Sequence, residues 1–200
     1  MLTSQDCHAQ HAWRQRERRE GIVLKRVKLE TPVASTASFV SQIEAAITPR
    51  TKVIEVMHIS FQTGYIAPVR EIVELARPRG IKVFVDGAHA FAHFPFTRDE
   101  LGCDFYGTRL HKWLHAPIGT GFLYVRRDKV KSLWPLMAGG VEQEDNIRKY
   151  GEIGRTPPPT TMPSPSPFTG RSARSGRSHA CDSSAIAGRV RCSRRATVRT

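Results

Sequence analysis

The sequence is short of cysteine and of long apolar segments. It has no C-x-x-C pair and no cysteine spacing typical of a metal site among its four cysteines, Cys7, Cys103, Cys181 and Cys192. We therefore expect unpaired thiols in a reducing compartment, and no metal. No apolar run approaches the roughly 20 residues that cross a bilayer, and the N-terminus has no signal-peptide core. These absences predict a cytoplasmic protein without a membrane partner.

Acidic residues are also scarce. The chain has 18 Asp and Glu against 31 Lys and Arg, which gives a formal net charge of +13. Residues 151–200 contribute +7 of this charge, because they hold nine arginines and only Glu152 and Asp182 as acids. The arginine-rich segment 12–21 and this tail permit a nucleic-acid-binding protein as an alternative. A mildly basic body equally suits a phosphate-bearing cofactor and acidic substrates, and we favour this interpretation.

The segment 155–200 lacks the pattern of a folded domain. It is rich in Pro, Ser and Arg, contains no Lys and shows no hydrophobic period. This composition predicts a disordered tail after a domain at residues 1–154. Translation of a GC-rich gene in a shifted reading frame is an alternative explanation of the same composition.

Strand and helix patterns alternate through the body of the chain. Helices are expected over residues 12–21, 38–47, 68–76 and 127–136, and strands over 22–29, 53–59, 81–85, 104–106 and 122–125. In the last helix, Val130, Leu133 and Trp134 are expected to face inward. The alternation predicts an α/β fold with a mainly parallel sheet flanked by helices.

Polar side chains follow two of the expected strands. Asp86 and His89 come after one apolar run, and His111 and Lys112 come after the next. Because ligands bind at the carboxyl ends of strands in open α/β sheets, these residues are expected to converge there. A carboxylate, an amine and two imidazoles suit an electron-poor heteroaromatic cofactor. Taken singly, Asp86 could instead cap a turn, and Lys112 could extend its amine into solvent.

Four motifs give the chain a family resemblance. They are D-G-A-H at Asp86–His89, L-H-K-W at Leu110–Trp113, A-P-I-G-T-G at Ala116–Gly121 and H-I-S-F-Q-T-G at His58–Gly64. Over roughly residues 2–154 the sequence resembles the class V aminotransferases, a family of pyridoxal-phosphate enzymes, and chiefly their isopenicillin N epimerase-like branch. The resemblance implies part of the large domain of a fold-type-I enzyme. Members of the family are longer than 200 residues, so a partial chain is expected.

The resemblance also implies roles at the strand ends. Lys112 would form a Schiff base with pyridoxal 5′-phosphate and later move the α-proton of an amino-acid substrate. Asp86 would hold the pyridinium nitrogen, and His89 would border the ring. His111 would contact the phosphate.

Two positions depart from the family pattern. Arg109 stands where the family usually has a Ser or Thr near the phosphate, so either Thr108 or Arg109 would complete that site, unless the arginine blocks it. Phe61 stands where desulfurases have an Asn, which leaves Ser60 and Gln62 as polar candidates in that loop.

The reaction itself stays open at this point. Epimerisation, transamination and desulfuration share their first steps, and a cysteine desulfurase-like lyase is the alternative within the family. Family members are typically dimers with sites at the interface, so a homodimer is expected if this chain holds the parts that a dimer needs. A catalytically inactive chain is a further alternative.

Overall fold

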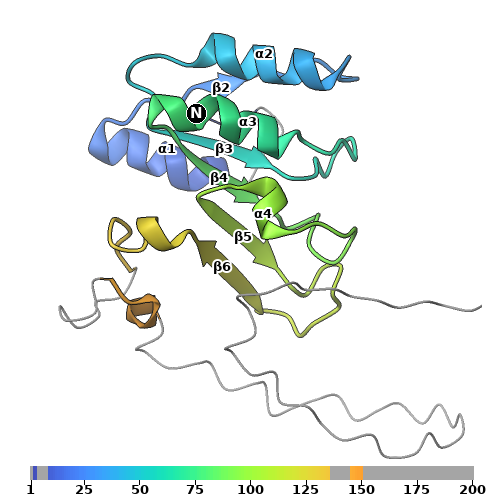
Figure 1. Ribbon diagram of the computed structural model, residues 1–200, viewed down its shortest axis with the longest axis vertical. Helices are drawn as coiled ribbons and strands as arrows, with labels where there is room; N and C mark the ends of the chain where they lie inside the picture. The colour runs from blue at the N-terminus through green and yellow to red at the C-terminus, as the bar shows by residue number, and fades with distance from the viewer. Residues whose placement is uncertain (1, 4–8, 136–144, 151–200) are drawn as a thin grey trace, which may run out of the picture. The chain divides into compact units, whose positions relative to one another are not determined.

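A computed structural model describes residues 2–3, 9–135 and 145–150. The chain divides after Lys129 into two compact units. The first unit is an α/β domain with a six-stranded sheet in the order β2-β1-β3-β4-β5-β6 (Figure 1). Its strands are β1 (Leu2–Thr3), β2 (Arg26–Val27), β3 (Val53–Met57), β4 (Lys82–Asp86), β5 (Phe105–Arg109) and β6 (Gly121–Val125). Its helices are α1 (Ala9–Glu20), α2 (Thr36–Ala46), α3 (Val69–Ala76) and α4 (Arg98–Leu101), with 3-10 turns η1 (Arg77–Arg79) and η2 (Arg127–Lys129).

Adjacent strands of this sheet are parallel, apart from β6. In the centre, β3 pairs with β4 from Val53 opposite Lys82 to Met57 opposite Asp86, and β4 pairs with β5. β6 runs antiparallel to β5. The mainly parallel α/β sheet predicted from the sequence is therefore confirmed, and its parallel strands end at a common edge.

The hydrophobic core lies on one face of the sheet. Side chains alternate between the two faces of a strand, and Val83 and Val85 of β4 point to the face where buried residues of α2 and α3 gather. That cluster includes Phe39, Ile43, Ile54, Val56, Ile72, Val73 and Ala76. Glu55 lies between two core residues of β3, so its side chain points to the opposite face, where it accepts a hydrogen bond from the Trp13 indole of α1. Helices therefore contact both faces.

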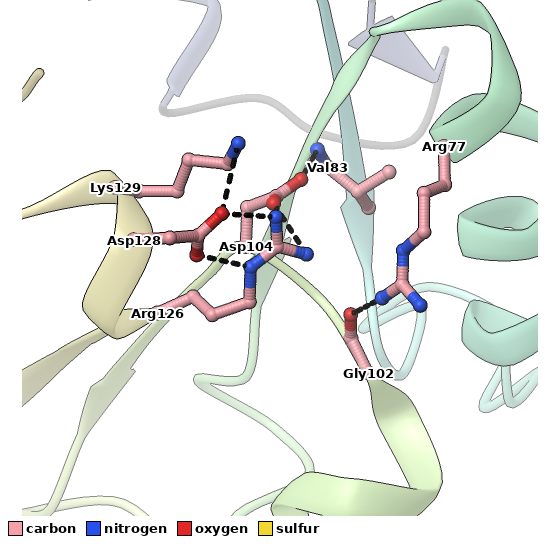
Figure 2. A network of polar contacts seen from close by, with 7 residues as sticks. All are labelled: Arg77, Val83, Gly102, Asp104, Arg126, Asp128 and Lys129. Carbon is pink, nitrogen blue, oxygen red and sulfur yellow. Dashed lines mark hydrogen bonds and ion pairs between the residues drawn. The ribbon is translucent and has the colours of Figure 1, made fainter.

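The amino-terminal edge of the parallel strands is held by a polar network (Figure 2). Asp104, immediately before β5, accepts a hydrogen bond from the Val83 backbone at 2.8 Å and pairs with Arg126, after β6, at 3.0 Å. Arg126 also pairs with Asp128. The network joins β4, β5 and β6 at the edge away from Asp86, so it is separate from the candidate site.

Two predicted elements differ strongly from the structure, and the strand predicted over 104–106 is β5 at Phe105–Arg109. The strand expected over residues 22–29 is reduced to Arg26–Val27. The helix expected over 127–136 is wrong within the described residues, because only Arg127–Lys129 form a 3-10 turn and Trp134 is 87% exposed. Pro135 explains the second difference, since it disfavours helical backbone at the residue before it.

The second unit is described over residues 130–135 and 145–150. Its 3-10 helix η4 (Ile147–Tyr150) is fastened to the preceding segment by the Tyr150 hydroxyl, which donates to the Leu133 carbonyl at 2.8 Å. The predicted tail, 155–200, and the boundary at 154 lie outside the described residues. No helix in the described part of the chain is long and apolar enough to span a membrane.

Candidate functional site

Asp86 is the last residue of β4, at the carboxyl edge of the sheet. Its carboxylate Oδ1 accepts a hydrogen bond from the backbone N–H of Ala88 at 2.9 Å, a turn typical of Asp. Its carbonyl accepts from the backbone N–H of His58 at 2.8 Å. Within the described residues, Oδ2 has no hydrogen-bond partner. Asp86 therefore caps its own turn with one carboxylate oxygen, and the described residues do not use the other.

The turn after Asp86 requires glycine. A Cβ on Gly87 would lie 2.0 Å from the phenolic oxygen and from Cζ of Tyr106, so no other residue fits without displacing that ring. Gly87 also donates to the Gly107 carbonyl at 2.7 Å and accepts from the Thr108 hydroxyl at 3.1 Å. These contacts clamp the Asp86 turn against β5.

Lys112 lies in the turn that follows β5, and its side chain meets His89. Lys112 Nζ is 2.7 Å from His89 Nε2, and both residues are half-buried. The loop that carries Lys112 is closed at its base by Leu110, which donates to the Thr120 carbonyl at 3.1 Å and accepts from the Ala116 N–H at 3.2 Å. The structure thus brings together Asp86, His89 and Lys112, which the sequence predicts as neighbours.

The surroundings of His89 favour the neutral form of its imidazole. Burial, and next the positive charge of Lys112, lower its pKa below the ordinary value, although Asp86 acts in the opposite direction. A neutral imidazole has a nitrogen lone pair, so His89 Nε2 can accept a hydrogen bond from the Lys112 ammonium.

Aromatic rings surround His89. The Phe61 ring stacks on it with 6.0 Å between centroids, and Trp113 meets it edge-on at 6.5 Å. Trp113 itself stacks on His93 at 3.9 Å. Phe61 and Trp113 remain 45% and 43% exposed, so one side of this aromatic group is open to a ligand.

Three residues near Lys112 bear on phosphate binding. His111 Nδ1 is buried and has no hydrogen-bond partner among the described residues. Arg109 is exposed and lies on the same face of β5 as Gly107, which pairs with Asp86. Thr108 points to the other face and is 8% exposed, and its hydroxyl donates a hydrogen bond to the Gly87 carbonyl. Of these three predicted phosphate contacts, Thr108 thus uses its hydroxyl to stabilise the turn.

The loop at His58–Gly64 reaches the site through Phe61. Ser60 is 3% exposed, and its hydroxyl oxygen accepts a hydrogen bond from the Thr63 N–H at 3.3 Å. Gln62 is exposed. Ser60 therefore shapes the loop, and the contact to His89 is made by the aromatic residue between the two polar candidates.

Two residues beneath the site, His58 and Tyr106, were not predicted from the sequence as part of it. The Tyr106 ring fills the space left by Gly87, and its hydroxyl lies 3.4 Å from His58 Nδ1. A glycine directly after the strand-end Asp86 is the only signal of such a close contact. It does not reveal which ring approaches. No cluster of potential metal ligands occurs in the part of the chain that the structure describes.

Comparisons with known proteins agree on one family. The family described as "Aminotransferase class-V" matches residues 1–159. An isopenicillin N epimerase of Streptomyces clavuligerus is 37% identical over 123 residues, which cover 62% of this chain and 31% of the relative.

Solved structures give the same result. The cysteine desulfurase CsdA of Escherichia coli matches with a TM-score of 0.61 and 27% identity, over 70% of this chain and 34% of that one. A mutant of C-DES with glycine covalently linked to its PLP cofactor matches with a TM-score of 0.59 and 26% identity, over 69% of this chain and 37% of that one. The chain therefore spans about a third of the length of the proteins it matches.

Proposed function

Because the chain belongs to the aminotransferase class-V family, we propose that it binds pyridoxal 5′-phosphate at the carboxyl edge of its sheet and acts on an amino acid through Lys112. The observation that carries the proposal is that Asp86 ends β4 and Lys112 follows β5, the parallel strand that pairs with it. When bound, the cofactor supplies an electron sink for negative charge at the substrate α-carbon.

The residues of the site fit this cofactor. The Asp86 carboxylate would bind the ring nitrogen and favour its protonated form through the oxygen that does not cap the turn. The Lys112 amine would carry the cofactor and, once released by substrate, would move the α-proton at Nζ. Phe61 and Trp113 leave apolar surface beside these groups for the ring and for the substrate.

Arg109 and His111 would bind the cofactor phosphate. The buried Nδ1 of His111 has no hydrogen-bond partner in the described residues. Buried polar atoms are normally hydrogen-bonded, so a bound phosphate would supply the partner. The guanidinium of Arg109 offers several donors in a geometry suited to phosphate. Arg109 would then replace the shorter hydroxyl side chain usual at this position in the family.

Epimerase-like transfer of the α-proton is the reaction we propose. A cysteine desulfurase-like lyase is the alternative within the family, and it needs a reactive cysteine near the substrate. Cys103, the cysteine within the described residues, is 2% exposed, and burial raises the pKa of its thiol to about 12. It also precedes β5 at the opposite edge from Lys112. Cys103 therefore does not supply that nucleophile.

The test is cofactor capture by the purified full chain. Incubation with pyridoxal 5′-phosphate should produce a visible absorption band of bound cofactor, and borohydride reduction followed by peptide mass mapping should locate the label on Lys112. Lys112→Ala should lose both signals. Lys52→Ala, a change at an exposed lysine before β3, should keep them. Labelling spread evenly over the surface lysines would overturn the proposal. Salt-sensitive nucleic-acid binding without cofactor capture would favour the nucleic-acid-binding alternative.

A further inference from the structure

The side chains of Lys112 and His89 meet directly at the carboxyl edge of the sheet. Lys112 Nζ and His89 Nε2 are 2.7 Å apart, which is a short hydrogen bond. A lysine on a turn otherwise has several rotatable bonds and many positions for its amine. The contact with His89 therefore fixes the amine at one of these positions, beside the carboxyl-terminal end of β4.

The chemistry of the two groups predicts which ring nitrogen of His89 carries the proton. Lysine in its charged form only donates, so Nε2 must present its lone pair and the ring proton must sit on Nδ1. The charged and titratable groups that face His89 are Lys112, Asp86 and His93. Burial and Lys112 both favour the neutral ring, in agreement with its role as acceptor.

The imidazole is itself held from two sides. Phe61, from the loop after β3, stacks on it, and Trp113, next to the lysine, meets its edge. His93 stacks on Trp113, and this contact fixes the plane of the tryptophan ring. Rotation of the His89 ring away from Lys112 would disturb these contacts.

We propose that His89 is a positioning residue that holds the Lys112 nitrogen at the sheet edge for attack on a carbonyl compound, and that Phe61 and Trp113 keep the imidazole in place. The inference rests on the proposed function for the identity of that carbonyl compound, pyridoxal 5′-phosphate. It predicts that a side chain with an oxygen acceptor can replace His89, whereas an aromatic ring without an acceptor cannot.

The first experiment needs no cofactor. Nitrogen NMR of the full chain at neutral pH should show His89 with its proton on Nδ1. Lys112→Met should move that proton toward Nε2, the site preferred by histidine in water, while Lys52→Met should leave it unchanged. A His89 proton on Nε2 in the unsubstituted chain, or no response to Lys112→Met, would overturn the inference.

The second experiment measures the rate at which Lys112 captures pyridoxal 5′-phosphate. His89→Phe keeps an aromatic ring between Phe61 and Trp113 but removes the acceptor, and it should slow capture roughly tenfold, the size expected for one charge-assisted hydrogen bond. His89→Gln should restore most of the rate, and the exposed His11→Gln should match the unsubstituted chain. Equal rates for His89→Phe and the unsubstituted chain would overturn the inference. Absence of capture by every chain would instead overturn the proposed function, and the NMR result would still decide the role of His89.

Discussion

His58 and Tyr106 form a buried pair under the Asp86 turn, with Nδ1 and the phenolic oxygen 3.4 Å apart. The two residues are 3% and 4% exposed, and Phe94 and Phe96 pack edge-on against the imidazole. Burial lowers the pKa of His58 from its ordinary 6.5 to about 4 and raises the pKa of Tyr106. Both groups are therefore neutral in the folded chain at neutral pH.

The pair makes the stability of the fold depend on pH. The unfolded chain binds a proton at His58 near pH 6.5, whereas the folded chain resists protonation until about pH 4. Stability from this group is thus complete above pH 6.5 and falls as the pH drops toward 4, by about 3 kcal/mol. Urea unfolding between pH 7.5 and 4 measures the change. His58→Gln should flatten this part of the profile, whereas the exposed His11→Gln should not. An identical slope in His58→Gln would exclude this histidine as the source.

Gly87→Ala should destabilise the fold by about 2 kcal/mol or more, because the added methyl group would overlap the Tyr106 ring. Gly107→Ala is the matched control on the neighbouring strand, since its Cβ would lie 3.2 Å from the far end of the Phe84 side chain, which can move. Its loss should be smaller. Urea unfolding of both variants provides the comparison, and equal losses would contradict the steric explanation.

Arg126→Ala should cost about 2 kcal/mol of unfolding free energy, because it leaves the carboxylate of Asp104, whose side chain is 9% exposed, without its charged partner (Figure 2). The control is Arg70→Ala. It breaks an ion pair with Glu74 in which both side chains are more than 60% exposed, and it should cost no more than about 0.5 kcal/mol. If Arg126→Ala lost no more unfolding free energy than Arg70→Ala, the network at this edge would contribute little to stability.

Arg109→Ser should weaken pyridoxal 5′-phosphate binding about tenfold while leaving the binding of pyridoxal, which lacks the phosphate, unchanged. Fluorescence or absorbance titration with each compound measures the two affinities. Tighter binding of the phosphate compound by Arg109→Ser would mean that the arginine blocks the phosphate. Equal weakening of both compounds would place Arg109 against the ring portion of the ligand.

Much of the fold is readable from local sequence patterns. Short apolar runs and helical spacing predicted β3, β4, α2 and α3 to within a few residues, because each pattern reflects burial of one element on the same core. The direction of β6 could also have been inferred. Its connection from β5 has no helical pattern, and a parallel strand needs a longer crossover.

Part of the candidate site could also be predicted from the sequence, and part could not. Asp86, His89 and Lys112 were identified from the sequence because each follows a strand, and strand ends meet at one edge. The contacts that each side chain makes could not be predicted from the sequence. Thr108 and Arg109 are adjacent in sequence, yet they point to opposite faces of β5. The Thr108 hydroxyl therefore donates to the Gly87 carbonyl, and the Arg109 side chain lies at the surface.

The sequence by itself determined the α/β class, the family motifs and the strand ends that bear the polar groups, since these depend on neighbours along the chain. Only the tertiary structure decided that Phe61 stacks on His89, that Lys112 lies within hydrogen-bond distance of it, and that Tyr106 fills the space at Gly87. These contacts join residues 19 or more positions apart, and their partners are selected by sheet register and packing. No local pattern carries that information.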